Sequence, residues 1–412
     1  MRITILTYGS QGDVQPCLAL AAALQAAGHS PLLALPAALR PQADQLGIPA
    51  IALPGDIARL SQGFNQAGKN PFGMLRVMRE NLEPVAVEVA RLAWQACQGA
   101  DLIVHTFLFT LGAHALARQL GIPDVSAQFF PMFFASARYP QLAFPELPLG
   151  RGYNRLTHHI ANAVFLSSQR AMYARLRKAV PGLPPRLPWP FKASGGRAAT
   201  PLLLAYSPSL VPPEPDWGAH VQPTGFWFLD SPGSYQPPVG LEEFLAATPQ
   251  PVCAGFGSML HPLSGRLQRA VLDGLRQAGQ RAVILTGWDG WEAAEPGPDR
   301  LFLHSAPHDW LFPRCAAIIH HGGAGTTAAA LRSGQPNLVL PLAVDQPFWA
   351  RRIHASGASL APLDPRTLTT AQVSGAARQA LESCDIRQSA AALGAAIRSE
   401  GGVSKAVELI EG

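Results

Sequence analysis

The residues best suited to chemistry lie in one short segment late in the chain, from His320 to Thr327. An apolar run typical of a buried strand ends there in two histidines and a glycine-rich turn, after which helix-forming residues begin. The turn consists of Gly322, Gly323, Ala324 and Gly325. With little side chain in the way, its N–H groups can approach an anion closely, and the next helix directs its positive end at the same point. Because many α/β turns need glycine for backbone geometry alone, the glycines fit a phosphate cradle or a plain turn.

The histidine pair favours the phosphate cradle. Adjacent residues of a strand point to opposite faces, so at most one of His320 and His321 is an ordinary core histidine. No third ligand lies at a recognisable spacing, and the pair is therefore a poor metal site. The hydroxyls of Thr326 and Thr327 suit either the cap of the following helix or phosphate oxygens.

The elements that position this turn belong to a strand–helix alternation that already appears at the start of the chain. The first elements expected are strands 3–8, 31–35 and 48–53, with helices 16–28 and 37–46 between them. Parallel strands joined by helices indicate a doubly wound sheet, whose ligands bind at the carboxyl ends of the strands. Asp13 lies just past the first strand, in the turn that begins at Gly9.

The middle of the chain is less regular. Residues 61–72, rich in Gly, Asn and Gln, are expected to be an irregular excursion before one long helix from Met74 to Cys97, which contains Pro84. Further elements are expected as strands 102–106 and 125–128 and helices 111–120 and 153–180. The aromatic segment 129–134 is more often core than ligand wall, although it could line an apolar cleft. Prolines are dense from 181 to 251, which indicates a connecting region.

A second strand–helix alternation follows this region. Its expected elements are strands 252–256, 282–286, 301–304, 318–321 and 338–342, helix 263–277, a helix after Asp345, and helices 370–381 and from 386 onward. The two halves thus share an architecture, and at 412 residues the chain is long enough for two domains.

Composition narrows the class of protein. The 32 Lys and Arg exceed the 27 Asp and Glu only mildly, which suits an anionic ligand or a membrane surface, and no basic run resembles a nucleic-acid stripe. The five cysteines are scattered, as is typical of a reducing compartment. Neither a signal peptide nor an apolar stretch of membrane-spanning length is recognisable, so a cytoplasmic location is expected.

Several motifs together resemble the family-one glycosyltransferases, and most closely the sterol glucosyltransferases. They are Gly9–Pro16 (GSQGDVQP), Phe256-Gly257-Ser258, Ala306–Pro313 (APHDWLFP), His320–Thr327, Asp345-Gln346, and the connecting segments 207–213 and 224–230. The resemblance implies the GT-B fold, two doubly wound Rossmann-like domains facing each other across a cleft. It places an acceptor-binding domain at 1–225, a linker at 226–239, a UDP-sugar-binding domain at 240–390, and helices at 391–412 that pack back toward the first domain.

The resemblance implies an inverting transfer of glucose from UDP-glucose to the hydroxyl of a sterol-like acceptor, without a metal or other cofactor. Such a transfer needs a base for the alcohol and donors for the departing diphosphate. Asp13 is implied as the base, although an aspartate there also suits a helix cap. For the diphosphate, the resemblance points to His320, with His321 left to packing. Its further donors are Ser258, Gly322, Gly323, Gly325 and Thr326.

The resemblance also assigns the residues that hold the sugar and the uracil of the donor. Asp345 and Gln346 match the acid–glutamine pair that holds hexose hydroxyls, with a helix N-cap as the alternative. The uracil is expected at the backbone from Ser305 through Ala306 to His308. Plant relatives carry tryptophan where this chain has Ser305, so Trp288 is a candidate stacking partner, or else a core residue.

For the acceptor, the expected wall consists of Phe129, Phe130, Met132 and Phe133 together with the 61–72 loop. Such a wall fits a sterol, and also an antibiotic, flavonoid or carotenoid aglycone. A sugar-nucleotide epimerase and a catalytically silent nucleotide-binding protein are the alternatives from other classes. Contact with a membrane would rest on surface basicity or on an amphipathic helix such as residues 151–178. No nucleic-acid partner is expected.

Overall fold

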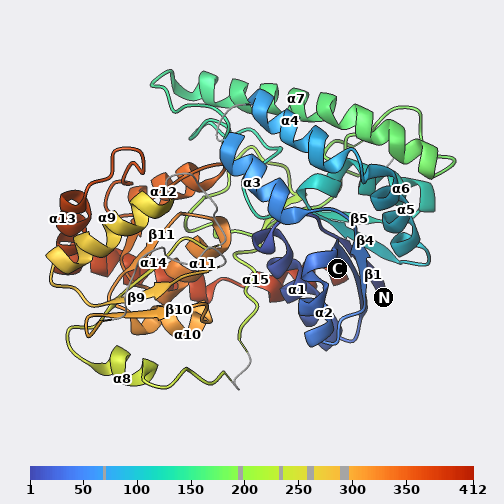
Figure 1. The fold of residues 1–412 in the computed structure, drawn as a ribbon. Coiled ribbons are helices and arrows are strands. Elements are labelled where there is room, and N and C mark those ends of the chain that lie inside the picture. Colours follow the sequence, from blue (N-terminus) through green and yellow to red (C-terminus); the bar gives the residue numbers. More distant parts are fainter. Residues whose placement is uncertain (68–70, 194–197, 232–234, 258–263, 288–296) are drawn as a thin grey trace. The chain divides into compact units, whose positions relative to one another are not determined.

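The computed structural model describes residues 1–67, 71–193, 198–231, 235–257, 264–287 and 297–412, and Figure 1 shows its course. The chain forms two compact units. Unit 1 comprises Met1–Pro208, Pro212–Leu229 and Glu400–Gly412, and unit 2 comprises Ser209–Val211 and Asp230–Ser399. The main crossing, from Leu229 to Asp230, lies within the segment 226–239 that the sequence marks as a linker.

Unit 1 contains a parallel sheet of seven strands in the order β3-β2-β1-β4-β5-β6-β7. The strands are β1 (Arg2–Leu6), β2 (Ser30–Pro36), β3 (Ala50–Leu53), β4 (Leu102–His105), β5 (Asp124–Gln128), β6 (Leu202–Leu204) and β7 (Val221–Pro223). Strand order reverses between β1 and β4, which pair with each other. Loops that leave neighbouring strands in opposite directions open a crevice at such a point, where doubly wound sheets bind their ligands.

Helices cover both faces of this sheet. They are α1 (Gln11–Ala26), α2 (Arg40–Gln45), α3 (Ile57–Ala67), α4 (Pro71–Leu82), α5 (Ala86–Cys97), α6 (Thr110–Leu120), α7 (Gly150–Ala179) and α15 (Gly402–Glu411). One core lies among the sheet, α1 and α15, and a second among the sheet, α5, α6 and α7. The last helix, α15, thus belongs to unit 1, whereas α14 (Cys384–Ser399) packs on α11 (Ala324–Ser333) in unit 2.

Two expectations about the 57–97 region are wrong. Residues expected to be irregular are helical, since α3 runs to Ala67 and α4 begins at Pro71. The helix expected from 74 to 97 is divided in two, because α4 ends at Leu82, and α5 begins at Ala86. Pro84 lies between them, where its missing N–H and its ring break a helix. Leu60 is buried in the second core, so tertiary packing outweighs the weak local helix preference of α3.

Unit 2 contains a parallel sheet of five strands in the order β10-β9-β8-β11-β12. The strands are β8 (Val252–Gly255), β9 (Ala282–Leu285), β10 (Arg300–Leu303), β11 (Ile318–His320) and β12 (Asn337–Val339). The described helices are α8 (Leu241–Ala246), α9 (Ser264–Gln277), α10 (His308–Leu311), α11, α12 (Gln346–Ala355), α13 (Thr370–Glu382) and α14. Here the strand order reverses between β8 and β11, directly before the glycine turn.

Candidate active site

The glycine turn joins the end of β11 to the start of α11. Gly323 is the N-cap residue and Ala324 the first helical residue. Gly322 has φ +88°, and a Cβ there would lie 2.9 Å from Val339 Cγ1 and 3.2 Å from the backbone oxygen of Gln346. Glycine is therefore required at 322 by both conformation and space. Gly325 is exposed, and a Cβ there would meet no atom of the described residues within 4 Å, so this position in the first turn of the helix is open.

The two histidines differ in their hydrogen bonding. His320 is 1% exposed, and its Nδ1 accepts a hydrogen bond from the Gly322 N–H at 3.1 Å. Its Nε2 must then carry the proton, and it donates to Asn337 Oδ1 at 3.0 Å. The Asn337 amide is oriented by its own bond from Nδ2 to the Gln335 oxygen. Burial, aided by the nearby His321, lowers the pKa of His320 to about 3, so the ring is neutral at pH 7.

His321 is the histidine that borders the turn. Its Nδ1 is buried and has no hydrogen-bond partner within the described part of the chain. A Cβ at Gly323 would lie 2.6 Å from His321 Nε2, and one at Gly257 would lie 3.3 Å from Cε1. The ring thus lies between two strand ends, and burial lowers its pKa to about 4.

This geometry distinguishes the two members of the pair. His320 was expected to contact a diphosphate and His321 to pack. In the structure His320 has both ring nitrogens engaged inside unit 2, and no proton remains for an outside acceptor. In His321, Nδ1 is buried without a partner in the described part of the chain, and Nε2 is the nitrogen that lies beside Gly323. The sequence showed that the two rings must face opposite ways, but the partner that selects between them, Asn337, lies 17 residues later on β12.

The turn after β8 lies beside this site. Gly257 has φ +64°, and a Cβ at Gly287 would collide with the Gly257 carbonyl oxygen, so the turns after β8 and β9 touch. Close backbone approach explains glycine at both positions. The predicted donor Ser258 and the candidate stacking residue Trp288 fall outside the described residues.

The loop after β12 carries the acid–glutamine pair. Val344 has φ +55°, an unusual conformation for a β-branched residue and one that is often found at functional sites. Gln346 is buried, and its Oε1 accepts the N–H groups of Leu342 and Ala343 at 2.8 and 3.0 Å. Asp345 is half-buried, and its Oδ2 accepts the Trp349 indole N–H at 2.7 Å. Gln346 therefore shapes the loop, while Asp345 is the more exposed of the two.

The segment after β10 lies at the same carboxyl edge of the unit 2 sheet as the turns after β8, β11 and β12. Ser305 is exposed and Ala306 half-buried in the connection to α10. The His308 ring stacks on Phe312, with centroids 4.3 Å apart, and burial lowers the His308 pKa to about 4. Every candidate donor residue that the structure describes thus follows a strand of one sheet, at its carboxyl edge.

In unit 1, Asp13 lies just after β1, at the reversal between β1 and β4. It occupies the third helical position of α1, which begins at Gln11 rather than at the expected Pro16. Asp13 Oδ2 accepts the Ser10 N–H at 2.8 Å and the Ser10 hydroxyl at 3.0 Å, and a Cβ at Gly9 would collide with the carboxylate. Burial raises the pKa of Asp13 above its ordinary value, and the Ser10 bonds partly offset this.

The capping interaction and a role as base are compatible. The Ser10 bonds occupy one carboxylate oxygen, and no bond to Oδ1 is made within the described part of the chain. The residue as a whole is half-buried, although its carboxylate is buried enough to raise its pKa. A carboxylate held on one side and raised in pKa can accept a proton on the other.

The aromatic segment after β5 lies mainly inside unit 1. Phe129 packs edge-on to Trp227, and Phe133, at φ +74°, contacts Phe107, Phe165 and Phe191. Met132 is also buried, and Phe130 is half-buried against Phe107. These four side chains therefore serve the core in this structure, as the sequence pattern most often indicates.

An apolar pocket opens elsewhere in unit 1, and none of those four residues lines it. Its wall consists of side chains from α4, α5, α6 and α7 together with Tyr8, which directly precedes Gly9. Gln169 of α7 lines the pocket, is 8% exposed and makes no hydrogen bond within the described part of the chain. A buried amide of this kind can recognise a hydroxyl or carbonyl group of a bound molecule.

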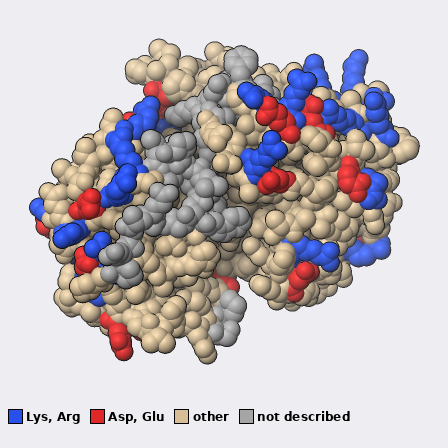
Figure 2. Space-filling view, viewed as in Figure 1, with Lys and Arg blue, Asp and Glu red and all other residues tan. Residues whose placement is uncertain are grey.

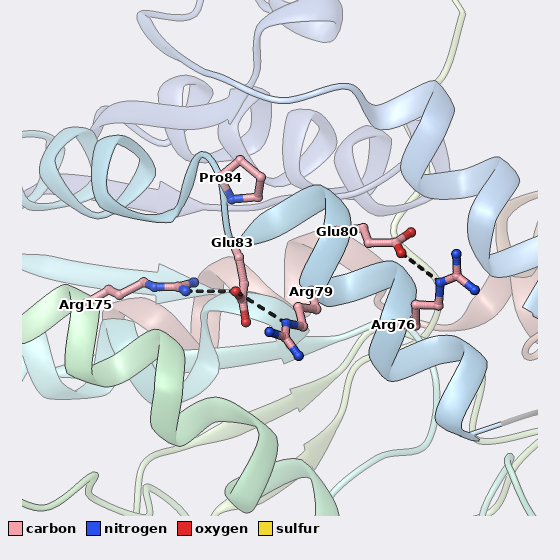
Figure 3. Close-up of a pocket in the computed structure, with 6 residues that line it drawn as sticks. All are labelled: Arg76, Arg79, Glu80, Glu83, Pro84 and Arg175. Carbon is pink, nitrogen blue, oxygen red and sulfur yellow. Dashed lines mark hydrogen bonds and ion pairs between the residues drawn. The ribbon is translucent and has the colours of Figure 1, made fainter.

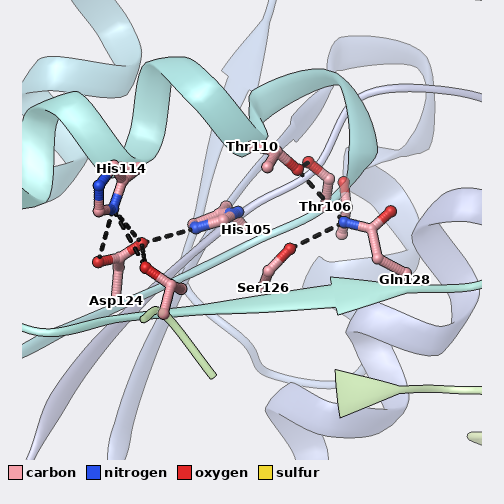
Figure 4. A network of polar contacts seen from close by, with 8 residues as sticks. His105, Thr106, Thr110, His114, Asp124, Ser126 and Gln128 are labelled. Carbon is pink, nitrogen blue, oxygen red and sulfur yellow. Dashed lines mark hydrogen bonds and ion pairs between the residues drawn. The ribbon is translucent and has the colours of Figure 1, made fainter. Parts of the chain in front are cut away.

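A buried polar network between β4, β5 and α6 was not expected from the sequence. His105 Nε2 and His114 Nδ1 both lie 3.0 Å from Asp124 Oδ2, and Figure 4 shows the two rings directed at the carboxylate. Burial alone would raise the pKa of Asp124, but the hydrogen bonds from both histidines lower it well below its usual range. Each residue comes from a different element, so sequence spacing gives no signal. All three side chains are buried.

The structure offers no metal centre in the part of the chain that it describes, where no group of three or more suitable side chains converges. Among the same residues, no helix has the length and apolarity to span a bilayer.

Comparison with known families covers both halves of the chain. Residues 3–138 match the glycosyltransferase family 28 N-terminal domain. Residues 295–409 match the erythromycin biosynthesis protein CIII-like C-terminal domain. Sterol 3-beta-glucosyltransferases of Aspergillus clavatus and Neurospora crassa are each 33% identical over 100% of this chain, which covers 29% and 27% of their lengths. The chain therefore spans less than a third of these relatives.

Solved structures with the same fold align over the whole chain. The calicheamicin glycosyltransferase has a TM-score of 0.73 at 17% identity, with 100% of this chain and 97% of that chain covered. A glycosyltransferase from Streptomyces sp. SF2575, complexed with thymidine diphosphate, has a TM-score of 0.68 at 21% identity, with 100% and 99% covered. At these identities the likeness establishes the fold.

Proposed function

Because this chain belongs to the glycosyltransferases of the GT-B fold, we propose that it transfers glucose from UDP-glucose to the hydroxyl of a sterol-like acceptor with inversion. The observation that carries the proposal is the convergence at the β8–β11 reversal of unit 2. There the unpaired His321 ring, the Gly322–Gly325 turn and the amino end of α11 provide donors for a diphosphate. The 33% identity to sterol 3-beta-glucosyltransferases supports the acceptor class.

The diphosphate is the leaving group, and its stabilisation lowers the barrier to transfer. The first N–H groups of α11 have no partner within the helix and carry the positive end of its dipole. A neutral His321 donates one further hydrogen bond from the nitrogen that carries its proton. These donors are fixed before the reaction, so no reorganisation is needed as charge develops.

The acceptor hydroxyl needs a base on the other side of the sugar. In our proposal Asp13 takes that proton, because it follows β1 at the strand reversal of unit 1 and burial makes it more basic. The sugar hydroxyls meet Asp345, the more exposed member of the acid–glutamine pair. The uracil lies along the backbone from Ser305 to His308.

The apolar pocket beside Tyr8 provides the acceptor site. Apart from Tyr8, Gln169 and Tyr173, its lining is apolar, which suits a lipophilic skeleton with few polar groups. The hydroxyls of Tyr8 and Tyr173 already donate to the backbone oxygens of Pro54 and Pro184. Gln169 therefore provides the polar contact in an otherwise apolar site.

An acceptor screen tests this function. The purified chain is incubated with UDP-glucose and one of cholesterol, ergosterol or a polyketide aglycone, and UDP release and the glycoside are measured. We expect release that depends on the sterol and a β-linked product. Release with the polyketide alone would favour antibiotic acceptors. The match of residues 295–409 to the erythromycin biosynthesis protein CIII-like domain supports that alternative. Conversion of the nucleotide sugar without any acceptor would refute transfer.

A further inference from the structure

Helix α7 exposes an apolar stripe over its first half. Leu149, Leu156, Ile160 and Val164 are 63%, 55%, 42% and 47% exposed, and Leu147, just before the helix, is 46% exposed. Spacings of seven, four and four residues place the helical members on one face. Single exposed apolar residues are ordinary, but members spaced in this way on one helix face form an apolar stripe.

The same helix is strongly basic. Its 30 residues include six Lys or Arg and no Asp or Glu. Arg170, Arg177 and Lys178 are exposed and form no ion pair within the described part of the chain. In Figure 2, blue side chains gather at the upper right, where Figure 1 places the second half of α7. The exposed face thus passes from apolar to cationic along a helix of about 45 Å.

The neighbouring charges do not cancel this excess. The acidic side chains of α4 and the turn after it are already engaged, because Glu80 pairs with Arg76, and Glu83 with Arg79 and Arg175 (Figure 3). Asp216, opposite the first half of α7, pairs with Arg155 at 2.6 Å. The three exposed basic residues of the second half therefore keep their charge for an outside partner.

The buried face of α7 lines the apolar pocket. Gln169, Met172, Tyr173 and Leu176 contribute to that wall, whereas the adjacent Arg170 and Arg177 are exposed. One helix thus separates the pocket from the apolar and basic surface. A lipophilic molecule dissolved in a bilayer would reach the pocket past this helix.

We propose that α7 docks unit 1 on an anionic lipid bilayer, with the Leu149–Val164 stripe inserted among the acyl chains and the Arg170–Lys178 end against the headgroups. Apolar insertion combined with cationic attraction is how interfacial helices bind membranes. This proposal rests on the proposed function and adds that the lipophilic acceptor comes from the bilayer. Binding of vesicles is nevertheless independent of sugar transfer, so the two can fail separately.

Vesicle flotation of the full chain tests the apolar part. We expect Leu156→Asp combined with Ile160→Asp to weaken binding to phosphatidylcholine–phosphatidylserine vesicles about tenfold or more. Both side chains are exposed, so the melting temperature is expected to stay unchanged. Val87→Asp is the matched control, because Val87 is 52% exposed on α5 of the same unit, and it should bind as the unaltered chain does. Equal losses in both variants would overturn the proposal.

The charge part has its own comparison. Arg170→Gln with Lys178→Gln should weaken binding about fivefold per residue, and vesicles of phosphatidylcholine alone should bind poorly. Arg276→Gln, at an exposed position on α9 of unit 2, should have no effect. Light scattering tests whether a second copy of this chain, and not a bilayer, covers the stripe. A dimer that the Leu156 and Ile160 changes dissociate, without vesicle binding by the unaltered chain, would show that the stripe is an interface between copies and refute the lipid proposal.

Discussion

Replacing each of the two adjacent histidines by alanine should produce opposite defects. In His320→Ala the Gly322 N–H and Asn337 Oδ1 lose their partner inside unit 2. Each buried unpaired group costs about 1–3 kcal/mol, so the expected loss of unfolding free energy is about 2–6 kcal/mol. At about 2–4 °C per kcal/mol for a unit of this size, the melting temperature should fall by on the order of 10 °C.

In His321→Ala no hydrogen bond within the described chain is lost at Nδ1, so the melting temperature should fall less than in His320→Ala. If His321 donates to the diphosphate, kcat should fall by about 10²–10³, as is found when one such donor is removed. Thermal unfolding and UDP release under saturating UDP-glucose and sterol measure the two effects. The reasoning would be refuted if His320→Ala kept its stability and lost more turnover than His321→Ala.

Three further outcomes are expected. Gly325→Ala should leave the free energy of unfolding unchanged or raise it by up to about 1 kcal/mol, since a helix favours alanine over glycine. The added methyl group enters the open space of the site, so UDP binding measured by calorimetry should be weaker. Asp13→Asn should abolish transfer and retain UDP binding, and retained turnover would place the base elsewhere. Because the raised pKa of Asp13 makes its carboxylate unfavourable in the folded state, thermal stability at pH 7 should not fall. His308, His320 and His321 have pKa values of about 3 to 4 when folded and about 6.5 when unfolded. The unfolded chain therefore gains protons first, and stability should decline as pH falls from about 6.5 to 4. For buried His320 the decline should be about 1.4 kcal/mol per pH unit. Unfolding that is independent of pH over this range would contradict that burial.

The sequence by itself determined the features that depend on neighbours along the chain. Most strands were recognisable as short apolar runs and the turns after them by glycine, although β6 and β7 lie in the region expected to be a connection. Asp13 and the 322–325 glycines follow β1 and β11 as predicted, but the helices begin earlier than expected, at Gln11 and Ala324. Helix α3 was not recognisable, because its residues favour a helix weakly and its stability comes from the core that Leu60 enters. The break at Pro84 is a local feature, because proline disrupts the interior of a helix.

Only the tertiary structure decided which side chains remain available for chemistry. His320 and His321 look alike in sequence, and Asn337 on the neighbouring strand engages one of them. The phenylalanines after β5 are drawn into the core, while the apolar pocket is built from helices far apart in the chain. The physical reason is the same in each case: hydrogen bonding and burial are settled by contacts across the sheet and between helices, and local sequence patterns carry no information about those partners.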